Sequence, residues 1–253
     1  MNINPDSKVP LYLQLKEYIL EKIKNNEWTV GEKLPTETEL QELLGISRIT
    51  VRHAFELLEN EGYVVKKRAK GTFVAPPKFS YHLPKLTSFS EDIIQKNCIP
   101  GSKTITLEVL SNPAIAAQME VPDVTPLMHI VRLRTVNSIV MSMHDSYYNL
   151  NILDSNIMIK SITSGSLQEQ LDNQSISLYS ILEKEHHIII DCADESLKAI
   201  SCPPEIAERL EISVDDPLLY LERKTYTSDG DVLEFSKMYN RADIYNYTIR
   251  LTR

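Results

Sequence analysis

The sequence predicts an α+β protein of two domains. The N-terminal domain is helical and ends in a β-hairpin, and in the C-terminal domain helices flank an antiparallel sheet. Three observations favour this fold class. A length of 253 residues exceeds what one compact domain usually holds. Helical spacing of apolar residues is followed, within residues 1–75, by two short strand-like runs. Further on, residues 114–135 and 205–226 repeat one order of helix, turn and strand.

The composition is that of a globular protein from a reducing compartment. Apolar residues make up 42% and charged residues 25%, which is usual for soluble domains. No apolar run reaches the roughly 18 residues of a membrane helix, and the opening MNINPDSKVP lacks the pattern of a secretory signal. Cys98, Cys192 and Cys202 are not in metal-ligand spacing. We therefore expect a cytoplasmic protein with no membrane partner and no metal site.

The first helix is expected between Pro10 and about Asn26. Proline fits the first turn of a helix, where its missing N–H has no partner to lose. The apolar residues that follow at three- and four-residue spacing are Tyr12, Leu15, Ile19 and Ile23.

Two more helices follow, joined by a tight turn. Thr36 and Glu39 form a capping box at the start of the second helix, and Gly45 ends it. Ser47 can cap the third helix, which Gly62 stops. The residues expected in its core face are Val51, Ala54, Phe55 and Leu58. The residues expected on its exposed N-terminal face are Arg48, Thr50, Arg52 and His53.

A basic turn then joins two short strands, residues 63–65 and 72–74. Residues 62–75 hold four basic residues and no acidic one, although the chain has 27 Lys+Arg against 35 Asp+Glu. On charge alone, a solvated hairpin tip and a DNA contact explain this turn equally well.

Together these elements follow the winged helix-turn-helix plan. The third helix would lie in the major groove, where Arg can bind guanine and Ser or Thr can bind bases or phosphates. The hairpin tip would reach phosphates or the minor groove, and a glycine there permits close approach. Exposed arginines on helical hairpins also occur in proteins that bind no DNA, but the joint occurrence of all the parts favours DNA binding.

The stretch LPTETELQELLGISRITVRHAFELLENEGYVVKKRAKGTFV resembles the DNA-binding head of GntR-type bacterial regulators over its whole length. Thr38 stands where the family often has arginine, and Ala69 where it usually has glycine. We expect Gly71 to be the residue of closest approach. The DNA-binding residues expected from the helix face and the resemblance are Thr36, Thr38, Ser47, Arg48, Thr50, Arg52, His53, Arg68, Lys70, Gly71 and Thr72.

Residues 75–86, APPKFSYHLPKL, contain three prolines and little periodicity, which is typical of an extended linker. We expect a DNA-binding domain at 1–75, a linker at 76–87 and a second domain at 88–253.

The second domain contains a faint internal repeat. Aligned without gaps, Arg132 meets Arg223 and Tyr148 meets Tyr239. Each copy predicts a helix followed by an antiparallel hairpin, with duplication favoured over chance apolar alternation.

Side chains two residues apart on a strand share a face. Arg132 and Arg134 could therefore clamp a phosphate or carboxylate, or lie on a solvated surface. Glu234 and Ser236 likewise share a face. Such a mixture suits a polyol or a sugar phosphate better than an apolar ligand.

The segments LTSFSEDI, PLMHIVRLR, SGSLQEQL and EFSKMYNRADIY resemble the UTRA effector domain of the HutC subfamily, whose fold is chorismate-lyase-like. The resemblance implies that Phe89, Ser90, Arg132, Arg134 and Ser166 hold a phosphate. It also implies that Asp145 and Glu234 hold sugar hydroxyls. Asn240 stands where an aromatic residue is common, and we include it among the effector-binding residues.

No nucleophile, metal-ligand or nucleotide-binding motif is found, so neither catalysis nor a cofactor is expected. The sequence predicts a homodimeric repressor that binds double-stranded operator DNA and responds to a small effector, a sugar phosphate first of all. Two alternatives are a regulator that senses a urocanate-like organic acid and a DNA-binding protein without any ligand.

Overall fold

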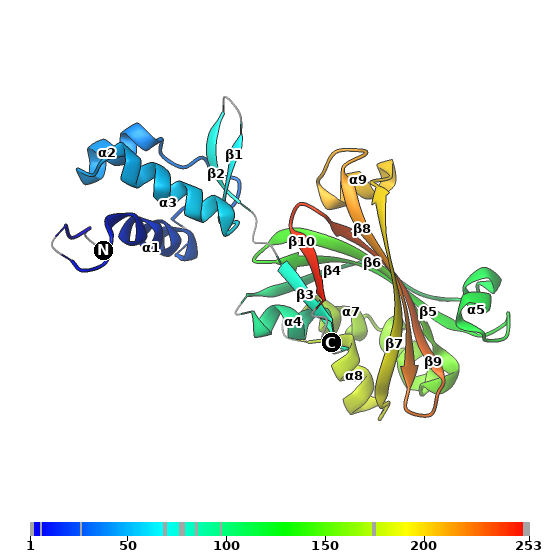
Figure 1. Ribbon diagram of the computed structural model, residues 1–253. Helices are drawn as coiled ribbons and strands as arrows, with labels where there is room; N and C mark the ends of the chain where they lie inside the picture. The colour runs from blue at the N-terminus through cyan, green and yellow to red at the C-terminus, as the bar shows by residue number, and fades with distance from the viewer. Residues whose placement is uncertain are drawn as a thin grey trace, which may run out of the picture. The chain divides into compact units, whose positions relative to one another are not determined.

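The computed structural model describes residues 3–5, 7–25, 27–67, 70–75, 79–83, 86–96, 98–173 and 176–249. The chain divides into two compact units, Met1–Lys78 and Phe79–Arg253 (Figure 1). Each unit is built around buried apolar residues of its own.

The N-terminal unit is a winged helix-turn-helix, as the sequence predicts. Its elements are α1 (Leu11–Lys24), α2 (Glu37–Leu44), α3 (Arg48–Asn60), β1 (Val64–Lys67) and β2 (Gly71–Val74). The two strands pair antiparallel as the wing. Leu15 and Ile19 of α1 pack with Phe55 and Leu58 of α3 in its core. The expected capping box of Thr36 and Glu39 starts α2, Gly45 ends it at φ 65°, and Ser47 caps α3.

Packing within the wing explains Gly71. Its φ is +119°, and a Cβ there would lie 2.7 Å from Cε of Lys33. Lys33 also forms a β-bridge with Phe73. The positive φ favours glycine here before any contact with DNA, whereas the Lys33 contact adds little because the end of a lysine side chain can move.

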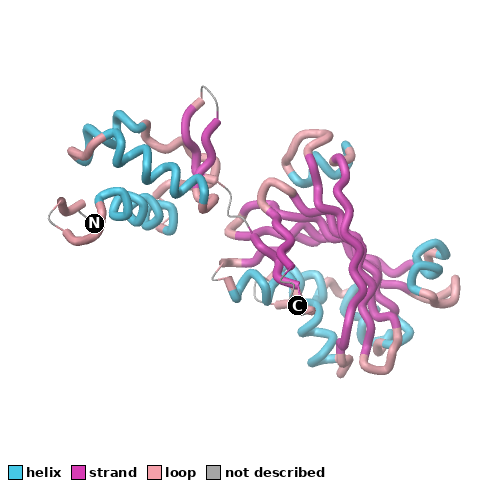
Figure 2. The backbone as a smooth tube through the Cα atoms, in the orientation of Figure 1, coloured by secondary structure: helices cyan, strands magenta, loops and turns pink. Residues whose placement is uncertain are grey.

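The C-terminal unit is built on an antiparallel sheet flanked by helices (Figure 2). The sheet has six strands in the order β4-β5-β6-β9-β8-β7. The strands are β4 (Pro100–Leu110), β5 (Leu127–Val136), β6 (Ile139–Asn149), β7 (Ile190–Ser201), β8 (Pro217–Thr227) and β9 (Val232–Arg241). The helices are α4 (Phe89–Gln95), α5 (Pro113–Met119), α6 (Ser155–Thr163), α7 (Ser166–Asp172), α8 (Leu178–Glu185) and α9 (Pro204–Leu210), with a 3₁₀ turn, η1, at Leu150–Ile152.

The helices cover the two faces of the sheet differently. Residues of α6, α7 and α8 pack against Met128, Ile130 and Tyr148 on one face. Residues of α5 and α9 pack in two separate clusters on the other face, against Tyr147 and Met143 respectively. The face that carries α8 is also the face that forms the cavity described below.

The sheet order reflects the predicted repeat. β4-α5-β5-β6 and β7-α9-β8-β9 occupy equivalent places, and the halves meet where β6 pairs with β9. The ungapped alignment matches Arg132 with Arg223 correctly. In the next strands it is wrong by one residue, because Arg132 pairs with His144 whereas Arg223 pairs with Ser236. A slip of one residue moves a side chain to the other face of a strand, so Tyr148 and Tyr239 are not equivalent.

Part of the segment predicted as a linker, residues 76–87, is a strand. β3 (Phe79–Leu83) pairs in parallel with β10 (Tyr245–Ile249), as a two-stranded sheet of its own. The five residues FSYHL stand between prolines at 77 and 84, so the proline content of the segment conceals a run that can pair.

Replacing Leu58, which is fully buried, by alanine is expected to destabilise the N-terminal unit by about 2–5 kcal/mol, because it leaves a cavity in the core. The chain's one tryptophan, Trp28, packs in this unit and reports its unfolding by fluorescence in urea. Leu43→Ala is the matched control, since Leu43 is 69% exposed and should change the midpoint little. Equal shifts for the two variants would contradict this account of the core.

Candidate functional site: the helix-turn-helix surface and an arginine-lined cavity

Two arginines stand at the exposed N-terminal part of α3. Arg48 Nε lies 3.2 Å from an oxygen of Glu37, and Arg52 Nε lies 3.6 Å from an oxygen of Glu56. Their side chains remain 72% and 61% exposed. Exposed ion pairs of this kind contribute little to stability, so exchanging these carboxylates for phosphates or base edges costs little.

The other expected DNA-binding residues of this region make contacts within the N-terminal unit. Ser47 and Thr36 use their hydroxyls as helix caps. Thr50 is half-buried, and its Oγ1 lies 2.9 Å from Oγ of Ser47. His53 is exposed but stacks on Tyr12, with ring centroids 4.1 Å apart.

In the wing, Lys70 is exposed and Thr72 is half-buried. Arg68 and Ala69 lie outside the described residues. Lys66 is 3.2 Å from Glu59, and Lys67 lies over the ring of Phe73 at 5.0 Å. Part of the positive charge of the turn is therefore already balanced within the unit. Thr38, also expected among the DNA-binding residues, is exposed on α2.

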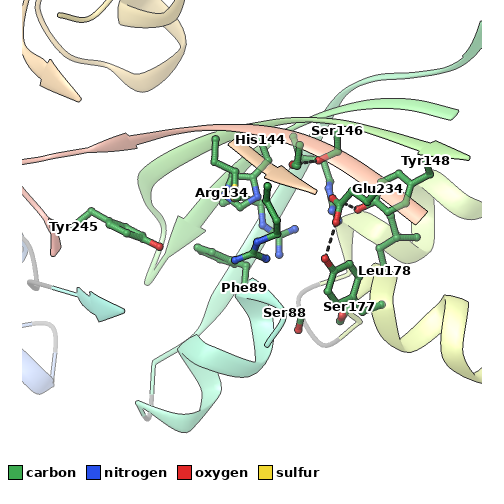
Figure 3. A pocket seen from close by; sticks show the side chains of 15 residues that line it. Ser88, Phe89, Arg134, His144, Ser146, Tyr148, Ser177, Leu178, Glu234 and Tyr245 are labelled. Carbon is green, nitrogen blue, oxygen red and sulfur yellow. Dashed lines mark hydrogen bonds between the residues drawn. The ribbon is translucent and has the colours of Figure 1, made fainter. Parts of the chain in front are cut away.

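In the C-terminal unit, residues from β5, β6, β8 and β9 line a cavity that α4, α8 and Tyr245 also border (Figure 3). Arg132 and Arg134 both face it, as the period of the strand predicts. Arg134 donates to Ser102 Oγ at 3.0 Å and to Ser90 Oγ at 3.3 Å, and its guanidinium carbon lies 4.5 Å from the ring centroid of Phe89.

A third arginine enters the same cavity from the other half of the repeat. Arg223 Nη2 lies 2.5 Å from Oε1 of Glu195 on β7. The second oxygen of Glu195 accepts a hydrogen bond from the hydroxyl of Tyr247 on β10. Arg223 was matched with Arg132 in the sequence but was not expected in the site.

A buried carboxylate lies at another part of the cavity wall. Glu234 accepts hydrogen bonds from the hydroxyls of Tyr148 and Tyr179, each at 2.6 Å (Figure 3). Burial, and then the charge of Glu234, raise the pKa of both tyrosines, so both stay protonated and donate. Ser146 and Ser236 are paired on β6 and β9, two positions from Tyr148 and Glu234, with their hydroxyl oxygens 2.5 Å apart.

His144 stands among the arginines as a neutral group. Burial, and then the charges of Arg134, Arg132 and Arg223, hold its pKa well below the ordinary value of 6.5. Its Nε2 lies 3.1 Å from the hydroxyl oxygen of Ser142. The positive charge of the cavity at neutral pH therefore comes from its arginines alone.

Four of the expected effector residues do not line this cavity. Ser90 only accepts the hydrogen bond from Arg134. Asp145 follows His144 on β6 and so points to the opposite face, where it binds Nε2 of His129 at 2.9 Å. Ser166 is the first residue of α7, and its hydroxyl donates to the carbonyl of Ser161 in α6. Asn240 is buried and donates to the carbonyl of Leu219, so it joins β9 to β8.

The cavity also contains residues that sequence reasoning missed. Leu178 and Tyr179 come from α8 and Ser177 is its N-cap, and no strand pattern could place this helix over the sheet. His144 and Ser146 could have been found by applying the alternation of β6 to the neighbours of Asp145. Across the described ranges, no helix is long and apolar enough to cross a membrane, and no cluster of three His, Cys, Asp or Glu side chains could hold a metal ion.

Comparisons with known proteins agree with this architecture. Residues 11–74 match the family model "Bacterial regulatory proteins, gntR family", and residues 96–246 match that of the UTRA domain. The chain is 33% identical to the HTH-type transcriptional repressor NagR of Bacillus subtilis, over all of this chain and 99% of the relative. It is 26% identical to the mannosyl-D-glycerate transport/metabolism system repressor MngR of Escherichia coli, over 95% of each chain.

Two further similarities concern a different repressor and the fold. The chain is 26% identical to the histidine utilization repressor of Klebsiella aerogenes, over 87% of this chain and 86% of the relative. The solved structure of PhnF from Mycobacterium smegmatis superposes with a TM-score of 0.69 and 21% identity, covering 95% of this chain and 98% of that one. This last similarity establishes the fold alone.

We expect the pKa values of His144 and His129 to be shifted in opposite directions from the ordinary value of 6.5. Burial lowers the pKa of His129, but hydrogen bonds with Asp145 and Glu108 outweigh it and raise that pKa. NMR of the imidazole C2–H resonances should show His129 titrating above pH 6.5 and His144 still neutral well below it, with His→Gln variants for assignment.

The depressed pKa of His144 also means that the unfolded chain binds its proton more tightly than the folded one. The stability contributed by neutral His144 is thus present above pH 6.5 and is lost as the pH falls below that value. A His144 resonance that titrates near pH 6.5 would contradict the arrangement of arginines around it.

Proposed function

Because the chain belongs to the GntR family of bacterial regulatory proteins, and carries the UTRA domain of its HutC subfamily, we propose that it is a repressor controlled by a phosphorylated sugar. GntR regulators bind operator DNA and small effectors, and this chain is such a regulator and not an enzyme. In the proposal, the N-terminal unit binds DNA, and the C-terminal unit binds the effector and forms a homodimer. Two heads on a pseudo-palindromic operator would supply the base contacts that one head lacks.

The observation that carries the choice of ligand is the environment of Arg132. This side chain is buried, and its Nη1 has no hydrogen-bond partner among the described residues. A buried cationic donor left without a partner costs at least about 1–3 kcal/mol, which a bound anion would recover. Arg134, two residues further along the strand, would complete a bidentate clamp on a phosphate.

The rest of the cavity wall supports a ligand that also carries hydroxyl groups. The hydroxyls of Tyr148 and Tyr179 donate their hydrogen bonds to Glu234, so their oxygens can accept hydrogen bonds from ligand donors. Ser146 and Ser236 offer two more hydroxyls. A sugar phosphate would use both the arginines and this hydroxyl-rich part.

A second candidate is a flat organic acid of the urocanate class. The similarity to the histidine utilization repressor favours it, and the arginines would bind a carboxylate as well as a phosphate. Such a ligand leaves the polar groups around Glu234 unused. Thermal unfolding with a panel of sugar phosphates and of aromatic acids separates the two classes, because a ligand that binds only the folded state raises the midpoint. No shift with any compound would support the ligand-independent alternative.

A continuous path leads from the cavity to the chain segment that enters the N-terminal unit. Tyr245 lines the cavity, and Tyr247 two residues later binds Glu195, the partner of Arg223. β10, which holds both tyrosines, is paired along its length with β3. β3 begins at Phe79, directly after Lys78. An effector that binds one position of β10 more tightly than another would shift the population of β3 positions with it.

Arg132→Ala is expected to leave affinity for a selected operator duplex unchanged and to weaken sugar phosphate binding by about 10- to 100-fold, since a charge-assisted hydrogen bond is removed. Fluorescence anisotropy of labelled DNA with increasing effector measures both. Lys198→Ala is the matched control, because it removes one positive charge from β7 outside the cavity. If wild-type concentrations of effector release the Arg132→Ala variant from DNA, this arginine is not part of the proposed clamp.

Tyr247→Phe should bind the effector with nearly normal affinity but release DNA less completely, because only the hydroxyl that joins β10 to Glu195 is removed. Tyr226→Phe is the control, since it removes a similar hydroxyl contact, to Asp194. Calorimetry gives the effector affinity and anisotropy gives the extent of release. Normal release with Tyr247→Phe would rule out this path, and a collapse of effector affinity would assign Tyr247 to the cavity wall instead.

A further inference from the structure

The outward face of α3 carries an apolar residue at its N-terminal end. Val51, Ala54, Phe55 and Leu58 form the buried face. Each residue two positions before one of these four lies about 200° further around the helix. The opposite face is therefore formed by Ile49, Arg52, His53 and Glu56. Ile49 therefore lies at the centre of the face that a recognition helix turns toward DNA, within the turn that enters the groove first.

Folding of the N-terminal unit does not explain this isoleucine. Ile49 is 73% exposed, the largest fraction among the large apolar side chains described in this unit. It belongs neither to the core nor to the partly buried apolar residues that pack against it. By contrast, Arg52 on the same face reaches Glu56, and His53 reaches Tyr12.

The chemistry of the major groove offers an apolar side chain one specific partner. Thymine alone among the four bases presents a methyl group there, whereas the other base edges present hydrogen-bond donors and acceptors. Isoleucine is stiff at χ1, so its methyl groups are held in place at little cost in entropy. Arg48 and Arg52, on either side in sequence, can meanwhile bind phosphates or guanine.

We infer that Ile49 is a specificity-determining residue that reads the 5-methyl group of a thymine in each operator half-site. The inference rests on the proposed binding of DNA by α3. It is independent of the effector and of the cavity.

The test begins with duplexes selected from a random library by the full-length protein. In the selected operator, each thymine in turn is replaced by deoxyuridine, which removes only the methyl group. At one position in each half-site the wild-type affinity should fall about fourfold for each methyl group removed. Ile49→Ala should bind the thymine and deoxyuridine duplexes alike, and Ile49→Val should give an intermediate penalty.

Val124→Ala is the control, because Val124 is 82% exposed in the C-terminal unit and its variant should retain the wild-type penalty. Trp28 fluorescence confirms that the N-terminal unit of each variant is folded. The inference is overturned if no deoxyuridine substitution weakens the wild type, or if Ile49→Ala retains the full penalty. Failure of the wild-type protein to select any sequence would refute the proposed function, and this inference with it.

Discussion

The antiparallel pairing of β6 with β9 is the constraint on which the rest of the C-terminal unit depends. It joins two halves of the same design, so that their equivalent faces become one continuous surface. Arg132 from one half and Arg223 from the other therefore face one cavity, although they are far apart in sequence. The two halves differ in whether the guanidinium group has a carboxylate partner. Arg223 has Glu195 beside it, whereas Nη1 of Arg132 has no hydrogen-bond partner among the described residues.

The electrostatics of the two units follow different rules. The arginines of α3 are exposed and lie in high dielectric, where their ion pairs exchange readily and salt screens them. The arginines of the cavity are buried, where an unsatisfied donor is costly and a neighbouring histidine loses its proton. In the proposed function, the same residue type would thus support reversible contact with a polyanion in one unit and selective binding of a small anion in the other. An overall acidic chain can combine both functions because each depends on local charge.

The parts of the fold that could be predicted are those with local signals. Caps such as Thr36 and Ser47, and the apolar spacing around Phe55, predicted the helices of the N-terminal unit. The alternation along β5 predicted that Arg132 and Arg134 face the same side of the sheet. Asp145 does not line the cavity because it follows His144 on β6 and so points to the other face, which a resemblance to a family cannot show. Tyr179 reaches the cavity from a helix that packs over the sheet, and β3 finds its partner near residue 245, so both depend on contacts that no local pattern encodes.

The parallel pairing of β3 with β10 has a consequence for synthesis of the protein. β3 follows the head directly, but β10 leaves the ribosome only after residues 84–244 have been translated, on the order of ten seconds later. The head, whose core is built from residues before 79, can fold during that interval, whereas β3 must wait without its partner. A nascent chain would thus gain the surface that binds DNA before it gains the means of being released from it.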